Sequence, residues 1–64
     1  MRVNGAEVIL QGECSLGAFL KKEGYDVSRV AVERNGEIVP KSAFETEMLC
    51  DNDRLEIVAF IGGG

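Results

Sequence analysis

Two Asn-Gly dipeptides limit how this chain can fold. Asn4-Gly5 and Asn35-Gly36 each lie between two short apolar runs, in "RVNGAEVIL" and "VAVERNGEIV". A two-residue turn between antiparallel strands needs positive φ at both central positions, which Asn and Gly adopt most readily. The sequence therefore predicts two β-hairpins. The first has strands over about 1–4 and 7–11, and the second ends at Pro40 or places it at an edge of the sheet.

A helix is predicted between the hairpins, in "CSLGAFLKKEG". Ser15 is placed to cap its first turn and Gly24 to end it in the left-handed conformation, so the helix is expected over about 16–23. Gly17 lowers helix stability but would let the helix lie close on a sheet. Three apolar residues have the spacing i, i+3, i+4 of one buried helix face: Leu16, Phe19 and Leu20.

The remaining segment adds a short helical turn and a last strand. Ser42 could cap a turn through Glu45, "CDND" reverses the chain, and "RLEIVAFI" has the composition of a long strand. The order of elements predicts an α+β fold, in which a mixed sheet of about five strands carries one main helix on one face. The crossover helix allows the first and last strands to pair in parallel as the central pair. This is the β-grasp, or ubiquitin-like, fold, expected over 1–61 and followed by a flexible glycine tail, 62–64.

Alternation along the last strand divides its side chains between two faces. Val58 and Phe60 fall on the open face, just before the tail, and are predicted to form a patch that docks a partner protein. The alternative is that they are isolated apolar surface residues, which are common. The core is expected to contain the opposite set together with residues from earlier elements: Val3, Leu16, Phe19, Leu20, Val30, Val32, Leu55, Ile57, Ala59 and Ile61.

The composition excludes several classes of function. The net charge is −4 and the pI about 4.6, so nucleic-acid phosphates and anionic membrane surfaces would repel the chain. No apolar run approaches the roughly 20 residues of a membrane span, and the N-terminus lacks the apolar centre of a signal peptide, so a cytoplasmic location is expected. The absence of His excludes Ser-His-Asp and Cys-His nucleophile pairs and histidine metal sites.

Few residues in the sequence could react or bind a metal. Cys14 and Cys50 form no CxxC pair and are interpreted as reduced, partly buried thiols, with a disulfide or a redox role as the alternative. The stretch from Asp51 to Arg54 begins like a calcium loop but lacks its glycine at position 6 and glutamate at position 12, which indicates a polar turn. Glu45 and Glu47 are interpreted as solvated charges. No catalytic or metal-binding residue is predicted.

Three glycines, Gly62 to Gly64, follow the most apolar stretch of the sequence. A phosphate-binding loop would lead into a helix, which the sequence after Gly64 does not supply. An idle tail is one remaining interpretation. The other is functional, because a tail without Cβ atoms can thread a narrow channel in whatever conformation the channel demands. Gly62 and Gly63 would then thread, and the Gly64 carboxylate would be activated by ATP as an acyl adenylate and attacked by a sulfur or nitrogen nucleophile.

Two stretches, "VAVERNGEIVPKSAF" and "DNDRLEIVAFIGGG", resemble the ThiS family, the sulfur carrier proteins of thiamine thiazole synthesis. The resemblance runs the length of the chain and rests on an Asn-Gly-x-x-Val-Pro hairpin, a late acidic turn and a terminal Gly-Gly. It implies that an E1-like adenylyltransferase activates Gly64 with ATP and Mg²⁺. Sulfur from a donor such as a cysteine desulfurase would then form a thiocarboxylate, and thiazole synthase would take that sulfur. The chain itself would be a cosubstrate rather than an enzyme and would bind no cofactor.

The residues leave other functions open. The same tail would serve a carrier of sulfur for molybdopterin or another product, because specificity then lies in the acceptor enzyme. A ubiquitin-like modifier would instead use Gly64 to form isopeptide bonds on lysines of other proteins. A plain interaction domain would have no tail chemistry at all.

Overall fold

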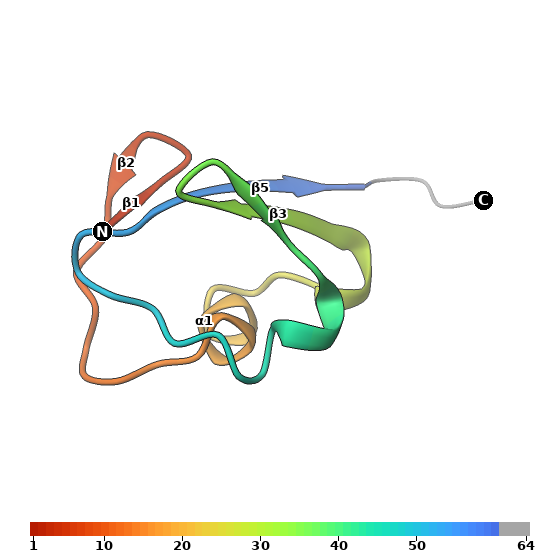
Figure 1. The fold of residues 1–64 in the computed structure, drawn as a ribbon, viewed down its shortest axis with the longest axis horizontal. Helices are drawn as coiled ribbons and strands as arrows, with labels where there is room; N and C mark the ends of the chain where they lie inside the picture. Colours follow the sequence, from red (N-terminus) through yellow and green to blue (C-terminus); the bar gives the residue numbers. More distant parts are fainter. Residues whose placement is uncertain (61–64) are drawn as a thin grey trace.

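The computed structural model describes residues 1–60, and its sheet has the strand order β2-β1-β5-β3-β4 (Figure 1). β1 pairs in parallel with β5, and the other neighbours pair in antiparallel fashion. The predicted mixed sheet, with the first and last strands side by side, is confirmed. The strands are β1 (Arg2–Val3), β2 (Ala6–Glu7), β3 (Val30–Arg34), β4 (Glu37–Val39) and β5 (Arg54–Ala59).

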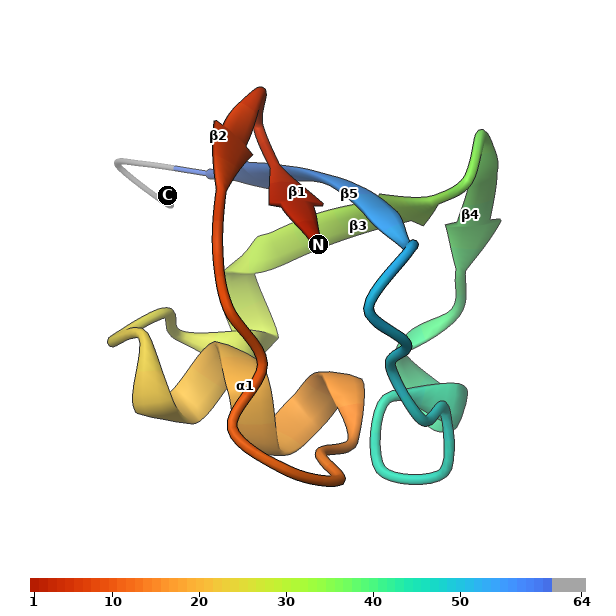
Figure 2. The same cartoon turned by 90° about the vertical axis from the view of Figure 1, so that its left-hand side faces the viewer.

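Both Asn-Gly turns are the two-residue hairpin turns that the sequence predicts. Val3 pairs with Ala6 across the first turn, where φ is +51° at Asn4 and +85° at Gly5. The second turn is alike, with φ of +53° and +88° at its Asn and Gly. The predicted length of the first hairpin is wrong, because β2 ends at Glu7 instead of continuing to position 11. Val8 still exchanges backbone hydrogen bonds with Met1, at 2.8 and 3.0 Å, and beyond it the chain leaves the sheet towards the helix (Figure 2). Val8 and Leu10 pack against the core, whereas Ile9 is exposed.

The helix α1 (Leu16–Lys22) lies across one face of the sheet (Figure 2). Ser15 caps it as predicted, with its hydroxyl accepting a hydrogen bond from the Ala18 N–H at 3.1 Å. Gly24 has φ of +87°, as expected of a residue that ends a helix. Gly17 was predicted to let the helix lie close to the sheet, and this is wrong. The Gly17 N–H donates to the Phe44 carbonyl at 2.8 Å, so at this point the helix lies close to the segment after β4.

Two 3-10 helices, η1 (Val27–Arg29) and η2 (Lys41–Ala43), connect the longer elements. The predicted cap at Ser42 is wrong, because η2 begins after Pro40 and has no side-chain cap. Pro40 fixes φ near −65° and so starts the turn by itself. Within residues 1–60, no helix has the length and apolar character that crossing a membrane requires.

The core lies between α1 and the inner face of the sheet. All of its predicted members are buried except Ala59, which is exposed, and Ile61, which lies outside the described residues. Ala59 is the last residue of β5, a strand that extends beyond α1 in Figure 1, and it is exposed. Four further apolar residues, from segments that the periodicity does not assign to the core, are also buried: Met1, Val39, Phe44 and Leu49.

Candidate functional site

The end of β5 presents two exposed apolar side chains. Val58 and Phe60 are each 57% exposed and lie on the sheet face away from α1, as the alternation predicts. Ile38 on β4 is 65% exposed and lies on the same face, because it pairs with Glu33, which in turn pairs with Glu56 of β5. The exposure of the predicted docking patch is therefore confirmed, whereas its docking remains a prediction.

Two carboxylates lie side by side on this outer face. Glu33 and Glu56 are direct cross-strand partners, and both are exposed. Like charges in such a pair repel one another. A shallow hollow beside them is lined by Glu33, Asn35, Gly36, Asn52, Arg54 and Glu56. The outer face thus combines apolar side chains near the exit of β5 with negative charge in its middle, which suits a partner surface that is partly apolar and partly basic.

Asn4 holds β5 on the side that faces β1. Its backbone N–H donates to the Leu55 carbonyl at 2.9 Å. Its side-chain amide bonds to β5 two residues further on: Oδ1 accepts from the Ile57 N–H at 2.7 Å, and Nδ2 donates to the Ile57 carbonyl at 3.1 Å. The amide group therefore makes the two hydrogen bonds that the backbone of a further β1 residue would make. Sequence reasoning assigned Asn4 to the turn alone and missed these contacts.

Asn35 holds the start of β5 in a similar way from the other side. Its N–H donates to the Arg54 carbonyl at 2.8 Å, and its Oδ1 accepts from the Arg54 N–H at 3.0 Å. Its Nδ2 donates to Oδ1 of Asp53 at 3.0 Å. The two hairpin turns are thus both fastened to the strand that leads to the glycines.

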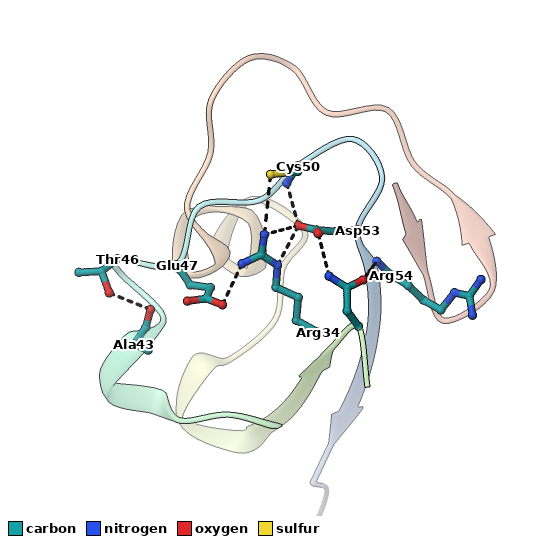
Figure 3. A network of polar contacts seen from close by, with 8 residues as sticks. Arg34, Ala43, Thr46, Glu47, Cys50, Asp53 and Arg54 are labelled. Carbon is teal, nitrogen blue, oxygen red and sulfur yellow. Dashed lines mark hydrogen bonds and ion pairs between the residues drawn. The ribbon is translucent and has the colours of Figure 1, made fainter. Parts of the chain in front are cut away.

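Asp53 and Arg34 form the centre of a polar network beside this strand (Figure 3). Arg34 lies between two carboxylates, with Nε 2.9 Å from Oδ2 of Asp53 and Nη1 2.8 Å from Oε2 of Glu47. Burial raises the pKa of Asp53, but hydrogen bonds from Asn35, the Cys50 N–H and Arg34 outweigh it and hold that pKa below its ordinary value. Hydrogen bonds to Asp53 and Glu47 favour the charged form of Arg34 and so raise its pKa. The network ties the second hairpin to the segment before β5.

A comparison of the sequence with family models matches the ThiS family over residues 1–64. The chain belongs to the ThiS family. A crystal structure of the thiamine biosynthesis protein ThiS from Geobacter metallireducens supports this, with a TM-score of 0.80 and 30% identity over 98% of this chain and 96% of that one. The predicted family and β-grasp fold are confirmed, and so, at the level of the family, is the predicted sulfur carrier of thiamine biosynthesis.

Two of the curated relatives of this ThiS-family chain bear on its function. The chain is 54% identical over 35 residues to the sulfur carrier protein ThiS of Bacillus subtilis, which is 55% of this chain and 53% of that protein. It is 50% identical over 62 residues, 97% of its length, to a thiazole synthase of Paramagnetospirillum magneticum. The chain spans only 19% of that thiazole synthase.

Two predictions for single side chains of the ThiS-family chain are wrong. Glu47 is paired with Arg34 instead of solvated, because the segment after η2 runs back beside β3. Cys50 is exposed instead of partly buried, whereas Cys14 is half-buried against the core as predicted, and both are free thiols as predicted. The predicted polar turn before β5 is present, and Asp53 at its end is buried and only 5% exposed. The Glu45 side chain is largely exposed as expected, although it lies 3.8 Å from Lys21.

The tail residues Gly62, Gly63 and Gly64 lie outside the described residues, so the predictions made for them stay predictions. Within the described part, no group of three or more His, Cys, Asp or Glu side chains is arranged to share a metal ion. What the structure describes of the site is the strand that leads to the tail, its two fastenings and its exposed outer face.

Proposed function

We propose that this ThiS-family chain carries sulfur, as a thiocarboxylate on Gly64, for synthesis of the thiamine thiazole. The supporting observation is the end of β5: a strand held on both sides leads to the exposed Val58 and Phe60, and in the sequence Ile61 alone separates Phe60 from three glycines. This arrangement lets a partner bind the rigid sheet while the side-chain-free tail enters its active site. Freezing each tail residue costs about 1–2 kcal/mol, which docking of the outer face would offset.

The chemistry belongs to the partners. The Gly64 carboxylate attacks the α-phosphorus of ATP and pyrophosphate leaves, so an acyl adenylate forms on an E1-like adenylyltransferase that holds ATP and Mg²⁺. A sulfur nucleophile then displaces AMP and leaves the thiocarboxylate. The chain supplies no acid or base and needs no cofactor of its own. It acts as a cosubstrate, with Gly62 and Gly63 threading the channel.

Thiazole synthase is the proposed acceptor. Two proteins named thiazole synthase, from Paramagnetospirillum magneticum and Magnetococcus marinus, contain a segment similar to this chain. Covalent linkage of two domains raises their effective concentration and suits partners that act on each other. A sulfur donor such as a cysteine desulfurase completes the set, and we place the reaction in the cytoplasm, where ATP is available.

The test is to incubate the chain with ATP, Mg²⁺, sulfide and the adenylyltransferase of the source organism, and then to digest it with trypsin. Cleavage after Arg54 releases "LEIVAFIGGG", which contains neither Met nor Cys. This matters because oxidation of Met or Cys would add nearly the same mass as exchange of oxygen for sulfur. We expect the peptide to gain the mass of sulfur minus oxygen, and the peptide also reports whether the mature chain ends at Gly64.

A chain lacking Gly63 and Gly64 is the control, and it should remain folded but take up no sulfur. If the peptide of the full chain keeps its mass under conditions in which ATP is consumed, the sulfur-carrier proposal is wrong. Conjugates of higher mass on lysines of other proteins would indicate a modifier instead. Unchanged biological activity of the shortened chain would indicate a plain interaction domain.

A further inference from the structure

We propose that Asn4 is a positioning residue for this sulfur transfer, because its side-chain amide sets the direction in which β5 delivers the docking patch and the tail. The inference rests on the proposed function and concerns the same site. According to this inference, a residue of the first hairpin turn, near the start of the sequence, determines which positions Gly64 can occupy in a partner.

The backbone of β1 is too short to guide β5 to its end. Their pairing stops at Val3 and Leu55, whereas β5 continues to Ala59. The Asn4 amide fills this gap by bonding both the N–H and the carbonyl of Ile57, at 2.7 and 3.1 Å. On the opposite side, β3 pairs with β5 as far as Ala59, and the Phe60 N–H donates to the Arg29 carbonyl at 2.7 Å. The strand is therefore held by β3 on one side up to its exit, and on the other side the contact beyond Leu55 is made by the Asn4 amide.

Small errors in the direction of β5 become large at the end of the tail. Gly64 lies seven residues after Ile57. At full extension in a partner's channel this distance is about 23–25 Å, so a tilt of about 10° at Ile57 would move the carboxylate by about 4 Å. Reacting groups need placement to within about 1 Å. Loss of the Asn4 amide should therefore weaken productive engagement even when the protein stays folded.

The chain contains its own matched control. Asn35 has nearly the same backbone conformation as Asn4, with φ of +53° against +51°, and its side chain also makes two hydrogen bonds to the segment of β5. These bonds, however, hold Asp53 and Arg54, where the strand begins. Gly accepts positive φ, so Asn4→Gly and Asn35→Gly keep both turns and each remove two side-chain hydrogen bonds.

The test measures sulfur loading by the adenylyltransferase, with the full chain, at a temperature where thermal melts show both variants folded. We expect Asn4→Gly to raise KM about fivefold or more, with a smaller change in kcat, and Asn35→Gly, which frees the strand only at its start, to raise KM clearly less. Amide hydrogen exchange should accelerate at Ile57 and Phe60, whose N–H groups donate to Asn4 and Arg29, in Asn4→Gly only. Asn4→Asp keeps the oxygen that accepts from the Ile57 N–H and loses the N–H that donates to the Ile57 carbonyl, so it should raise KM by less than Asn4→Gly. It replaces Asn4→Gly in the test if that variant does not fold.

Equal changes in KM for the two glycine variants would overturn the inference, since Asn4 would then act only through stability. Unchanged exchange at Ile57 and Phe60 would overturn it as well. Failure of the proposed function is a separate result, because the wild-type chain would then gain no sulfur. In that case the exchange rates still decide whether Asn4 holds the end of the strand.

Discussion

Asp53 accepts hydrogen bonds from three residues that belong to two parts of the chain. Arg34 and Asn35 approach from the second hairpin, and the Cys50 N–H donates from the preceding turn at 2.8 Å. The carboxylate is buried, yet it retains partners for both oxygens. It is ionised in the folded protein because these donors favour the charged form more strongly than burial disfavours it.

We expect Asp53→Asn to lower the free energy of unfolding by about 2 kcal/mol at pH 7, because Arg34 loses a charged partner and the Cys50 N–H a strong acceptor. The folded pKa of Asp53 lies below its unfolded value of about 3.9, so its contribution is complete above that pH and is lost as the pH falls through the folded pKa. Urea unfolding from pH 7 to pH 2 should therefore show wild type and variant converging in acid. Asp51→Asn, at an exposed position in the same turn, is the control. A constant difference at all pH values would contradict this account.

Single polar residues are the part of the site that the sequence predicted least well. Asp51, Asn52 and Asp53 are alike as turn formers, and nothing local indicates that only the third turns inward. Its selection depends on Arg34, 19 residues away. The same holds for Asn4, whose turn conformation is local and predictable but whose bond to Ile57 spans 53 residues. Val58 and Phe60 were predictable because strand alternation is a local rule.

Among the elements, the hairpins and α1 follow directly from short-range chemistry. Asn-Gly fixes the two turns, and Ser15 and Gly24 bound the helix to within one residue of the prediction. The ends of strands are less predictable, because they depend on whether a partner strand is present. β2 ends at Glu7, and after the hydrogen bonds between Val8 and Met1 the chain leaves the sheet and Leu10 packs against the core.

Strands β3 and β5 carry a built-in repulsion on their outer face. We expect Glu33→Gln to raise the free energy of unfolding by about 0.2–1 kcal/mol at low salt, because it removes the like charge opposite Glu56. Thermal melts at low and high ionic strength measure this, and the gain should shrink in salt, which screens exposed charges. Glu13→Gln changes the net charge equally at an exposed position outside the sheet and should have little effect. A gain of equal size in both variants would point to net charge instead of the pair.

For the whole molecule, the outer face is expected to account for recognition without contributing much to stability. We predict that Phe60→Ser weakens binding to the adenylyltransferase about tenfold or more, because exposed aromatics commonly supply most of the energy of an interface. Its thermal stability should stay within experimental error of the wild type. Isothermal titration calorimetry and melting curves provide the two measurements. Ile9→Ser, at an 80% exposed site outside the patch, is the control, and equal loss of binding in both would contradict a defined docking face.

The overall architecture was predictable because the order of elements admits few topologies once a crossover helix separates two hairpins. The full extent of the core was not. Phe44 and Leu49 come from segments without helical or strand periodicity, and they are buried because the chain between η2 and β5 passes alongside the first turn of α1, where Ser15 bridges to Met48.

Because β5 lies in the middle of the sheet, it also determines when, during synthesis, the protein can form the face that its partners recognise. This strand is made after the other four and yet lies between β1 and β3, so a nascent chain that has not passed Arg54 has two separated hairpins and no continuous sheet. An activating enzyme that recognises the assembled face would ignore copies that lack β5. Synthesis of β5 would then act as a checkpoint, and ATP would be consumed only on copies with an assembled sheet.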